Sequence, residues 1–288
     1  MKKIKISDYK VTSEIDLKNS VTKEVYSDAK KELKDIRKKL GEWQNMMYAH
    51  DKYAVLVCLQ GMDTSGKDSL VREVFKEFNV RGIECHSFKV PTDLERGHDY
   101  LWRHYLVLPP RGKFGVFNRT HYENVLVTRV HPEYILGENI PGINAVEDVN
   151  EAFWDKRFEE INNFEKHLAN NGTIIFKFFL NLSKEEQKSR LLRRLDKPSK
   201  NWKFSPDDLK ERKLWDQYQN CYQEAINRTS KLHAPWFVIP ADDKPTARLL
   251  VAKILYDNLM AHTDIQEPEL SDKIKSNLKS YKAQLDNE

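Results

Sequence analysis

Residues 53–69 read YAVLVCLQGMDTSGKDS, an apolar run followed by a segment with two glycines. The apolar run is of the kind that forms a buried parallel strand. The spacing Gly61-x4-Gly66-Lys67 is that of a phosphate-binding loop, in which backbone N–H groups and the lysine bind phosphate oxygens. Residues 69–79 have helical periodicity, so the order strand, loop, helix supplies the context that this motif requires. The stretch therefore predicts a phosphate-binding P-loop.

The loop departs from the usual pattern after its lysine. A serine or threonine that holds Mg²⁺ normally follows the lysine, whereas this sequence has Asp68. A second acid, Asp63, lies inside the loop, where a carboxylate would repel phosphate unless a cation lay between them. We therefore expect Asp63 to hold Mg²⁺, with Mn²⁺ as an alternative. Asp68 fits the first helical turn equally well, because the helix dipole favours an acid there. The loop residues expected to bind phosphate are Gly61, Thr64, Ser65, Gly66, Lys67, Asp68 and Ser69.

Strand-like and helix-like segments alternate along the chain. Segments rich in β-branched and aromatic residues have the length of strands, and helical periodicity separates several of them. This alternation predicts an α/β fold with a parallel sheet covered by helices on both faces, a three-layer sandwich. Besides the run before the loop, the expected strands lie at 82–90, 113–118, 173–182 and 236–241.

Amphipathic segments flank this core. Residues 27–49 have the apolar spacing of a helix, so we expect an N-terminal helical extension over 1–50 and a core over 51–262. Residues 263–288 are expected to form a helical tail that docks on the core or on another subunit, which favours a homo-oligomer. The apolar stripe of this tail is Leu270, Ile274, Leu278, Tyr281 and Leu285.

Composition excludes several classes of protein. With 48 Lys and Arg against 44 Asp and Glu, the net charge is only +4, too small to indicate a nucleic-acid partner. The longest apolar runs, around Tyr53–Leu59 and Ile174–Leu180, are too short to span a membrane. The three cysteines show no metal-binding spacing, and the N-terminus shows no signal-peptide pattern. We therefore expect a cytoplasmic protein with neither a membrane nor a nucleic acid as its partner.

Two charged segments complete the candidate site. Asn118 is the last residue of the expected strand 113–118 and Arg119 follows it, at the carboxyl end where the crevice of an open α/β sheet lies. Glu123 and Arg129 come soon after; an ordinary solvated face is the alternative for these charges. Further basic side chains near the strand ends, which would guide a long anionic chain, include Lys89 and Arg103.

A basic helix follows the strand 173–182 and begins at the capping box Ser183-x-x-Glu186. Its arginines are expected to share one face, with Leu191, Leu192 and Leu195 on the other. We interpret residues of about 183–213 as a lid, because arginines in a lid neutralise a transferring phosphoryl group and exclude water. A solvated basic face is the alternative. The arginines expected to bind phosphate are Arg190, Arg193 and Arg194.

Four segments together resemble the polyphosphate kinase 2 family. They are GMDTSGKDS (61–69), FKVPT (88–92), HDYLWRHYLVLPPRGKFGVFNRTHYENVLVTRVHPE (98–133) and residues 183–203. The resemblance implies a P-loop kinase fold with a mobile helical lid. It also implies Mg²⁺-dependent transfer of phosphoryl groups from inorganic polyphosphate to a nucleotide.

The resemblance also implies roles for single residues. Asp63, Gly66 and Lys67 match the Walker A loop, and Asn118 and Arg119 match the Walker B position. Many family members have Asp where this chain has Asn118, and an amide brings an oxygen but no charge. Together with Glu123, the Asn resembles the subgroup that phosphorylates AMP and ADP, with guanine nucleotides as alternative acceptors. The implied catalytic residues are Asp63, Lys67, Arg119 and Arg129, and the implied metal ligands are Asp63 and Asn118.

Two other functions compete with this one. An ATP-dependent P-loop kinase of a small metabolite predicts Ser or Thr after the loop lysine, where Asp68 stands. A nucleic-acid-binding module predicts a strongly basic balance and clustered aromatic platforms, and the basic segment has no such cluster.

Overall fold

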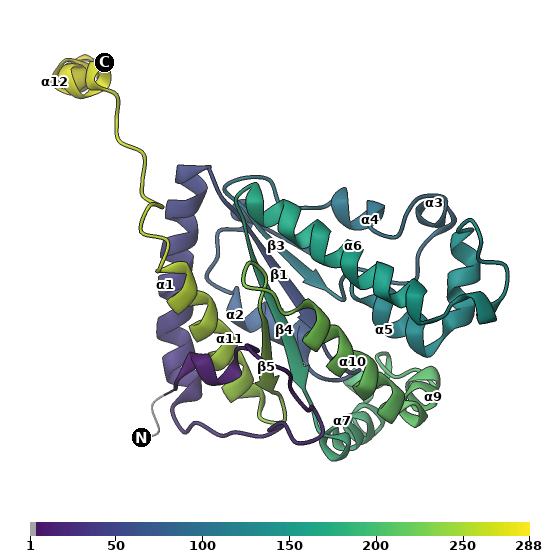
Figure 1. Cartoon of the computed structure of the whole chain (residues 1–288). Coiled ribbons are helices and arrows are strands. Elements are labelled where there is room, and N and C mark those ends of the chain that lie inside the picture. The colour runs from purple at the N-terminus through teal and green to yellow at the C-terminus, as the bar shows by residue number, and fades with distance from the viewer. Residues whose placement is uncertain (1–3) are drawn as a thin grey trace.

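The computed structural model describes residues 4–288. Its sheet has five parallel strands in the order β2-β3-β1-β4-β5, with β1 at the centre (Figure 1). The predicted α/β fold with a parallel sheet is confirmed, and each strand lies within its expected segment. The strands are β1 (Ala54–Gln60), β2 (Ile83–Ser87), β3 (Phe114–Asn118), β4 (Thr173–Asn181) and β5 (Trp236–Pro240).

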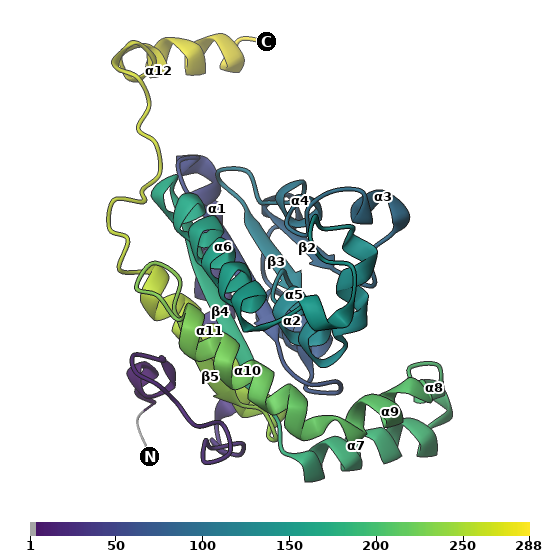
Figure 2. The same cartoon turned by 45° about the vertical axis from the view of Figure 1, so that its right-hand side comes forward.

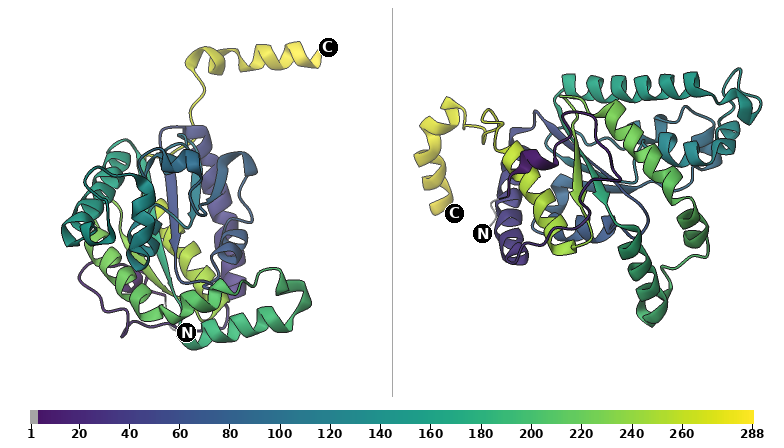
Figure 3. Two further views of the ribbon diagram at one scale, coloured as in Figure 1. Left: turned by 90° about the vertical axis from the view of Figure 1, so that its right-hand side faces the viewer. Right: turned by 60° about the horizontal axis from the view of Figure 1, so that its bottom comes forward.

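Helices cover both faces of the sheet (Figure 3). Alternate residues of β1 enter different cores, so Val57 packs under one helical layer and Cys58 under the other. All seven residues of β1 are buried, which is why its sequence is apolar without alternation. One layer consists of α1 (Ala29–His50), α2 (Lys67–Val74) and α11 (Lys244–Leu259), and the other of α5 (Glu123–Val130), α6 (Glu151–Asn170) and α10 (Trp215–Thr229).

Shorter elements surround these layers. The lid segment folds as three helices that extend below the sheet in Figure 2. The lid helices are α7 (Lys184–Asp196), α8 (Pro198–Asn201) and α9 (Asp207–Lys213). The others are α3 (Asp93–Arg96), α4 (Trp102–Tyr105) and α12 (Asp272–Asp286), with 3-10 turns η1 (Ile6–Tyr9), η2 (Val80–Gly82), η3 (Pro132–Glu138) and η4 (Val146–Asp148). None of the helices formed by residues 4–288 combines the length and the apolar character that crossing a bilayer requires.

Each terminal segment contains a helix, α1 near the N-terminus and α12 near the C-terminus. Apart from η1, residues 4–28 are irregular and run along the edge strand β5, where Val11 donates a backbone hydrogen bond to Trp236. The tail helix α12 projects from the body (Figures 1 and 2). The side chains of its apolar stripe are exposed. The single chain therefore does not place the tail on its own core, and docking on another subunit stays a prediction.

A buried ion pair ties the second helical layer to the sheet beside β3. Lys177 of β4 and Glu165 of α6 are both fully buried, with Nζ 2.6 Å from Oε2. Both side chains bind the hydroxyl of Tyr122, which follows β3, and the Lys177 ammonium also donates to the carbonyl of Thr229 in α10. Lys177 and then His121 outweigh the effect of burial and lower the pKa of Glu165. This network fixes the backbone next to Arg119.

We expect Lys177→Met to destabilise the protein by about 3–5 kcal/mol, because it leaves the Glu165 carboxylate buried without its counter-charge. The double variant Lys177→Met/Glu165→Leu should recover at least about 1 kcal/mol of that loss. Urea denaturation of both variants measures these free energies. A double variant that is no more stable than Lys177→Met would contradict a coupled pair.

Candidate active site

The loop between β1 and α2 has the backbone of a phosphate cradle. Gly61 and Gly66 have positive φ angles of 148° and 106°, and Thr64 between them has a φ of 62°. A Cβ on Gly61 would lie 2.9 Å from the carbonyl oxygen of Leu180, so only glycine fits there. Gly66 caps the N-terminus of α2, whose free N–H groups would face an anion bound in the loop.

Lys67 lies across this loop. Its Nζ donates to the carbonyl oxygens of Gly61, at 2.6 Å, and Met62, at 3.3 Å. Burial, and next the nearby Arg119, lower the pKa of Lys67 to about 8. An anionic phosphate in the loop would supply the counter-charge that these neutral carbonyls do not. Ser65 and Ser69 are turned toward the loop itself, since the Oγ of Ser69 donates to the Gly66 carbonyl.

The carboxyl end of β3 lies beside the loop because Asn118 is in register with Leu59 of β1. The Asn118 amide donates to the Asp68 carboxylate at 2.7 Å, while its own Oδ1 is buried without a partner. Arg119 has a φ of 58°, which turns its side chain out of the strand direction; its guanidinium lies 3.9 Å from Glu123. The side chains that the sequence placed at this edge are therefore together.

The donor atoms at this edge suit Mg²⁺ only when phosphate and water complete its coordination. The buried Asn118 Oδ1 is an unused oxygen, and Asp63 adds a carboxylate within the loop. Across the part of the chain that the structure describes, no group of three or more His, Cys, Asp or Glu side chains could hold a metal by itself. Mg²⁺ keeps several waters and binds phosphates through few protein ligands, so this donor set fits it.

A cavity of about 90 Å³ lies between the loop, α5, α10 and the lid. Lys67 and Arg119 face it together with Glu123, so cationic and acidic groups meet in one small space. A larger cavity of about 830 Å³ lies elsewhere, between residues 96–101 and the first half of α6. Five residues of α9 and α10 also line the small cavity: Asp208, Glu211, Arg212, Tyr218 and Tyr222.

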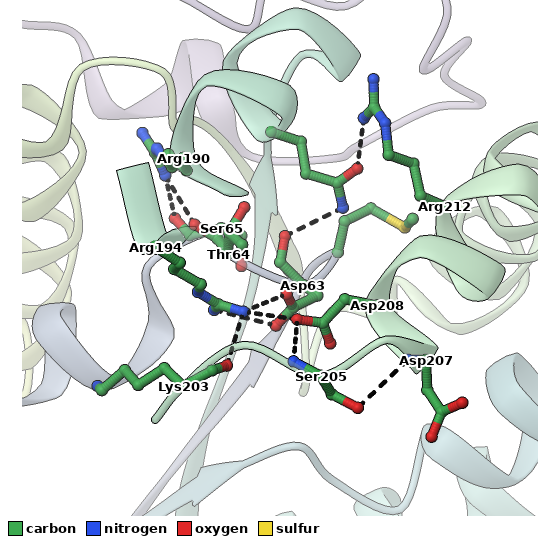
Figure 4. Close-up of polar contacts among 12 residues, drawn as sticks. Asp63, Thr64, Ser65, Arg190, Arg194, Lys203, Ser205, Asp207, Asp208 and Arg212 are labelled. Atoms are coloured by element: carbon green, nitrogen blue, oxygen red, sulfur yellow. Dashed lines mark hydrogen bonds and ion pairs between the residues drawn. The ribbon is translucent and has the colours of Figure 1, made fainter. Parts of the chain in front are cut away.

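Two lid arginines hold α7 against the loop (Figure 4). Arg194 bridges Asp63 and Asp208, at 2.9 Å from each carboxylate. Arg190 is buried, and its guanidinium donates to backbone carbonyls on both sides, those of Thr64 and Ser65 in the loop and those of Ala241 and Asp242 after β5. These contacts hold α7, the first helix of the predicted lid, against the loop.

The expected faces of α7 are wrong. Arg190 and Leu191 are both buried, whereas Leu192 and Leu195 are exposed. The loop carbonyls and Asp63 offer acceptors on the inner side, so arginines turn inward and two leucines are left in contact with water. Periodicity alone cannot show this, because it assumes that the inner side is apolar.

The other predicted residues lie farther from the cavity. Arg129 is held by Glu151 and Glu224 and lies over the Trp154 ring. Arg103 lies over the Phe88 ring and 3.5 Å from Glu95, and its guanidinium also donates to the carbonyl of Lys89. The side chain of Arg193 is exposed on the lid.

Sequence reasoning missed the acids and tyrosines that α9 and α10 bring to the cavity. Tyr218 donates to Glu211 at 2.6 Å, and Tyr222 lies near Arg119. The only signal was the cap and proline at Ser205-Pro206, which marks the start of α9 but says nothing of where that helix lies.

We expect Arg194→Lys to loosen the lid. The ammonium of a lysine lacks the planar fork with which the arginine binds Asp63 and Asp208 together. Losing one charge-assisted hydrogen bond costs about 1.5 kcal/mol, which raises the equilibrium constant for lid opening roughly tenfold. Hydrogen exchange of residues 197–213 measures this opening. The matched control is Lys210→Gln, on the exposed side of α9, which should leave the exchange unchanged. Equal exchange in both variants would show that Arg194 does not hold the lid.

Known proteins resemble this chain over most of its length. A family model described as Polyphosphate kinase 2 (PPK2) matches residues 20–267. The chain is 43% identical over 247 residues to the ADP-polyphosphate phosphotransferase of Rhodopseudomonas palustris, which covers 86% of this chain and 84% of that relative. It is 44% identical over 224 residues to the AMP/ADP-polyphosphate phosphotransferase of Meiothermus ruber, which covers 78% of each chain.

A solved structure agrees with these relatives. The crystal structure of polyphosphate kinase 2 from Arthrobacter aurescens TC1 superposes with a TM-score of 0.86 at 36% identity and covers 95% of each chain. The resemblance seen in the four sequence segments is thus confirmed over the whole core, and the chain belongs to the polyphosphate kinase 2 family.

Proposed function

We propose that this protein transfers phosphoryl groups from inorganic polyphosphate to AMP and ADP, giving ADP and ATP. The observation that carries the proposal is one cavity that joins Lys67, Arg119 and Glu123 under a lid closed by arginine, in a chain of the polyphosphate kinase 2 family. The relatives from Rhodopseudomonas palustris and Meiothermus ruber, whose names give ADP and AMP/ADP as substrates, support this choice of acceptors.

The proposed roles follow from the geometry. Lys67 and the loop N–H groups bind the phosphates between which the bond breaks, and Arg119 neutralises charge that develops during transfer. Asn118 and Asp63 would hold Mg²⁺, which neutralises the phosphates when bound. The closed lid excludes water, which would otherwise compete as the acceptor. Arg129 acts on Arg119 and Glu123 indirectly, by fixing α5 through its two ion pairs.

One alternative uses the same fold. An ATP-dependent metabolite kinase would need the hydroxyl that normally follows the loop lysine, and here Asp68 takes that place and binds Asn118. A basic groove for nucleic acid is less consistent with the cavity, because acids from α9 and α5 line it.

The setting of the protein is part of the proposal. We propose a homo-oligomer, because the apolar stripe of α12 is exposed on the single chain. We also propose a reducing, cytoplasmic environment, because the three cysteines are all free thiols.

An assay with one donor at a time tests the proposed reaction. With Mg²⁺ and AMP or ADP as the acceptor, polyphosphate as the only donor should yield ADP and ATP. ATP as the only donor should not phosphorylate AMP. Lys67→Ala should lower the rate by about a hundredfold or more while leaving the melting temperature within a few degrees, since it removes a charge at the reacting phosphates. Product formation from ATP but not from polyphosphate would identify the metabolite-kinase alternative instead.

We expect Glu123 to govern the choice of acceptor. AMP brings one phosphate fewer than ADP, so its reacting phosphate depends more on groups of the cavity itself, and Glu123 orients Arg119 there. Glu123→Asn should therefore lower kcat/KM for AMP about tenfold more than for ADP, which is about 1.4 kcal/mol of selective loss. Steady-state kinetics with each acceptor measure the ratio. An unchanged ratio would remove Glu123 from acceptor selection.

A further inference from the structure

Arg194 of α7 binds the same carboxylate to which the proposed function assigns the metal. Its Nη1 lies 2.9 Å from Oδ2 of Asp63, and its Nη2 lies 3.4 Å from Oδ1, so the guanidinium contacts both oxygens. Figure 4 shows the Arg194 side chain reaching from the lid to the loop at this point. A guanidinium and a divalent cation have charges of the same sign, so they repel each other when both contact one carboxylate.

Arg194 also has partners inside the lid. Its Nη1 lies 2.9 Å from Oδ2 of Asp208 in α9 and donates to the carbonyl of Lys203 at 3.3 Å. The Arg194 carbonyl in turn accepts a hydrogen bond from the Asn201 amide at 2.8 Å. These partners move with the lid, whereas Asp63 belongs to the loop. The lid can therefore keep Arg194 in place when its contact with Asp63 is lost.

Asp63 and Asp208 need a positive charge between them. Burial, and next the nearby Asp63, raise the pKa of Asp208, so the two carboxylates are close enough to repel each other. Arg194 lies 2.9 Å from both and compensates them together. A metal ion on Asp63 would supply that compensation instead, and the contact of Arg194 with the loop would lose its electrostatic advantage.

Arg190, one turn before Arg194 in α7, holds the loop in a different way. Its guanidinium donates to the backbone carbonyls of Thr64 and Ser65, at 3.0 Å from each. These acceptors are neutral, and a metal on the Asp63 carboxylate leaves them in place. The lid thus has one attachment that depends on Asp63 and one that does not. Losing the first would free residues 194–213 while α7 stays anchored at Arg190.

We propose that Arg194 and Mg²⁺ compete for Asp63, so that lid residues 194–213 are released from the loop when Asp63 binds the metal. This inference rests on the proposed function and adds a conformational device to it. The Arg194–Asp63 pair covers the loop until Asp63 is loaded, and its release then opens the cavity to the substrates. Closure over bound substrates depends on lid contacts other than this pair. Such coupling is reciprocal, so the pair weakens metal binding by the same factor as the metal opens the lid.

Hydrogen exchange of residues 197–213 in the wild-type protein tests the release of the lid. Inorganic phosphate is present with and without Mg²⁺, so that phosphate and water can complete the coordination of the metal. Saturating Mg²⁺ should raise the exchange about tenfold, the factor expected for one charge-assisted hydrogen bond. NaCl at the same ionic strength should raise it much less, because a partly buried pair is weakly screened. In Asp63→Asn, Mg²⁺ should leave the exchange unchanged.

Titration calorimetry with Mg²⁺ in the same phosphate buffer measures the reciprocal effect. Arg194→Gln should bind Mg²⁺ about tenfold more tightly than the wild type, because the lid no longer competes for Asp63. The matched control is Arg193→Gln, which removes the same charge from the next position of the same helix. The Arg193 side chain is exposed, so the affinity of this variant should stay within about twofold of the wild type.

Either of two results would overturn the competition: wild-type exchange that does not respond to Mg²⁺, or equal Mg²⁺ affinities of Arg193→Gln and Arg194→Gln. The exchange experiment needs no variant, so it decides the question even if Arg194→Gln fails to fold. Absence of Mg²⁺ binding in both the wild type and Arg194→Gln would also overturn it and would remove the metal from Asp63. Transfer from polyphosphate is measured separately in the donor assay, which decides the proposed function independently of the lid.

Discussion

The buried ion pair of Lys177 and Glu165 is the interaction on which the site depends. It joins β4 to α6 in a region without water, and both partners bind the Tyr122 hydroxyl. Two charges removed from water are stable only with these additional hydrogen bonds. Because Tyr122 lies between Arg119 and Glu123, the network that satisfies the buried charges also fixes the two residues that face the cavity.

The arginines around the loop make two different kinds of contact. Arg190 and Arg194 hold the lid, the first on loop carbonyls and the second on two carboxylates. Arg119, whose side chain is 52% exposed, has only the distant Glu123 as a partner and lines the cavity. A residue type that is common near phosphates therefore does not reveal by itself which side chains bind them.

The unusual acid after the loop lysine has a structural partner. Asp68 accepts a hydrogen bond from Asn118, so the residue that takes the place of the usual hydroxyl contacts the last residue of β3. The contact leaves the Asn118 Oδ1 as an unused oxygen. Asp68 and Asn118 therefore meet at one edge of the sheet, beside the loop.

The sequence by itself determined the strands and the loop, because burial on both faces makes β1 continuously apolar and the loop needs glycine at fixed positions. It also identified the family, since the segment from Asn118 to His131 is a local pattern. Only the tertiary structure decided which arginines hold the lid and which acids line the cavity. Many of these contacts join residues far apart in the sequence, and local periodicity does not show which groups a distant segment will bring to a contact.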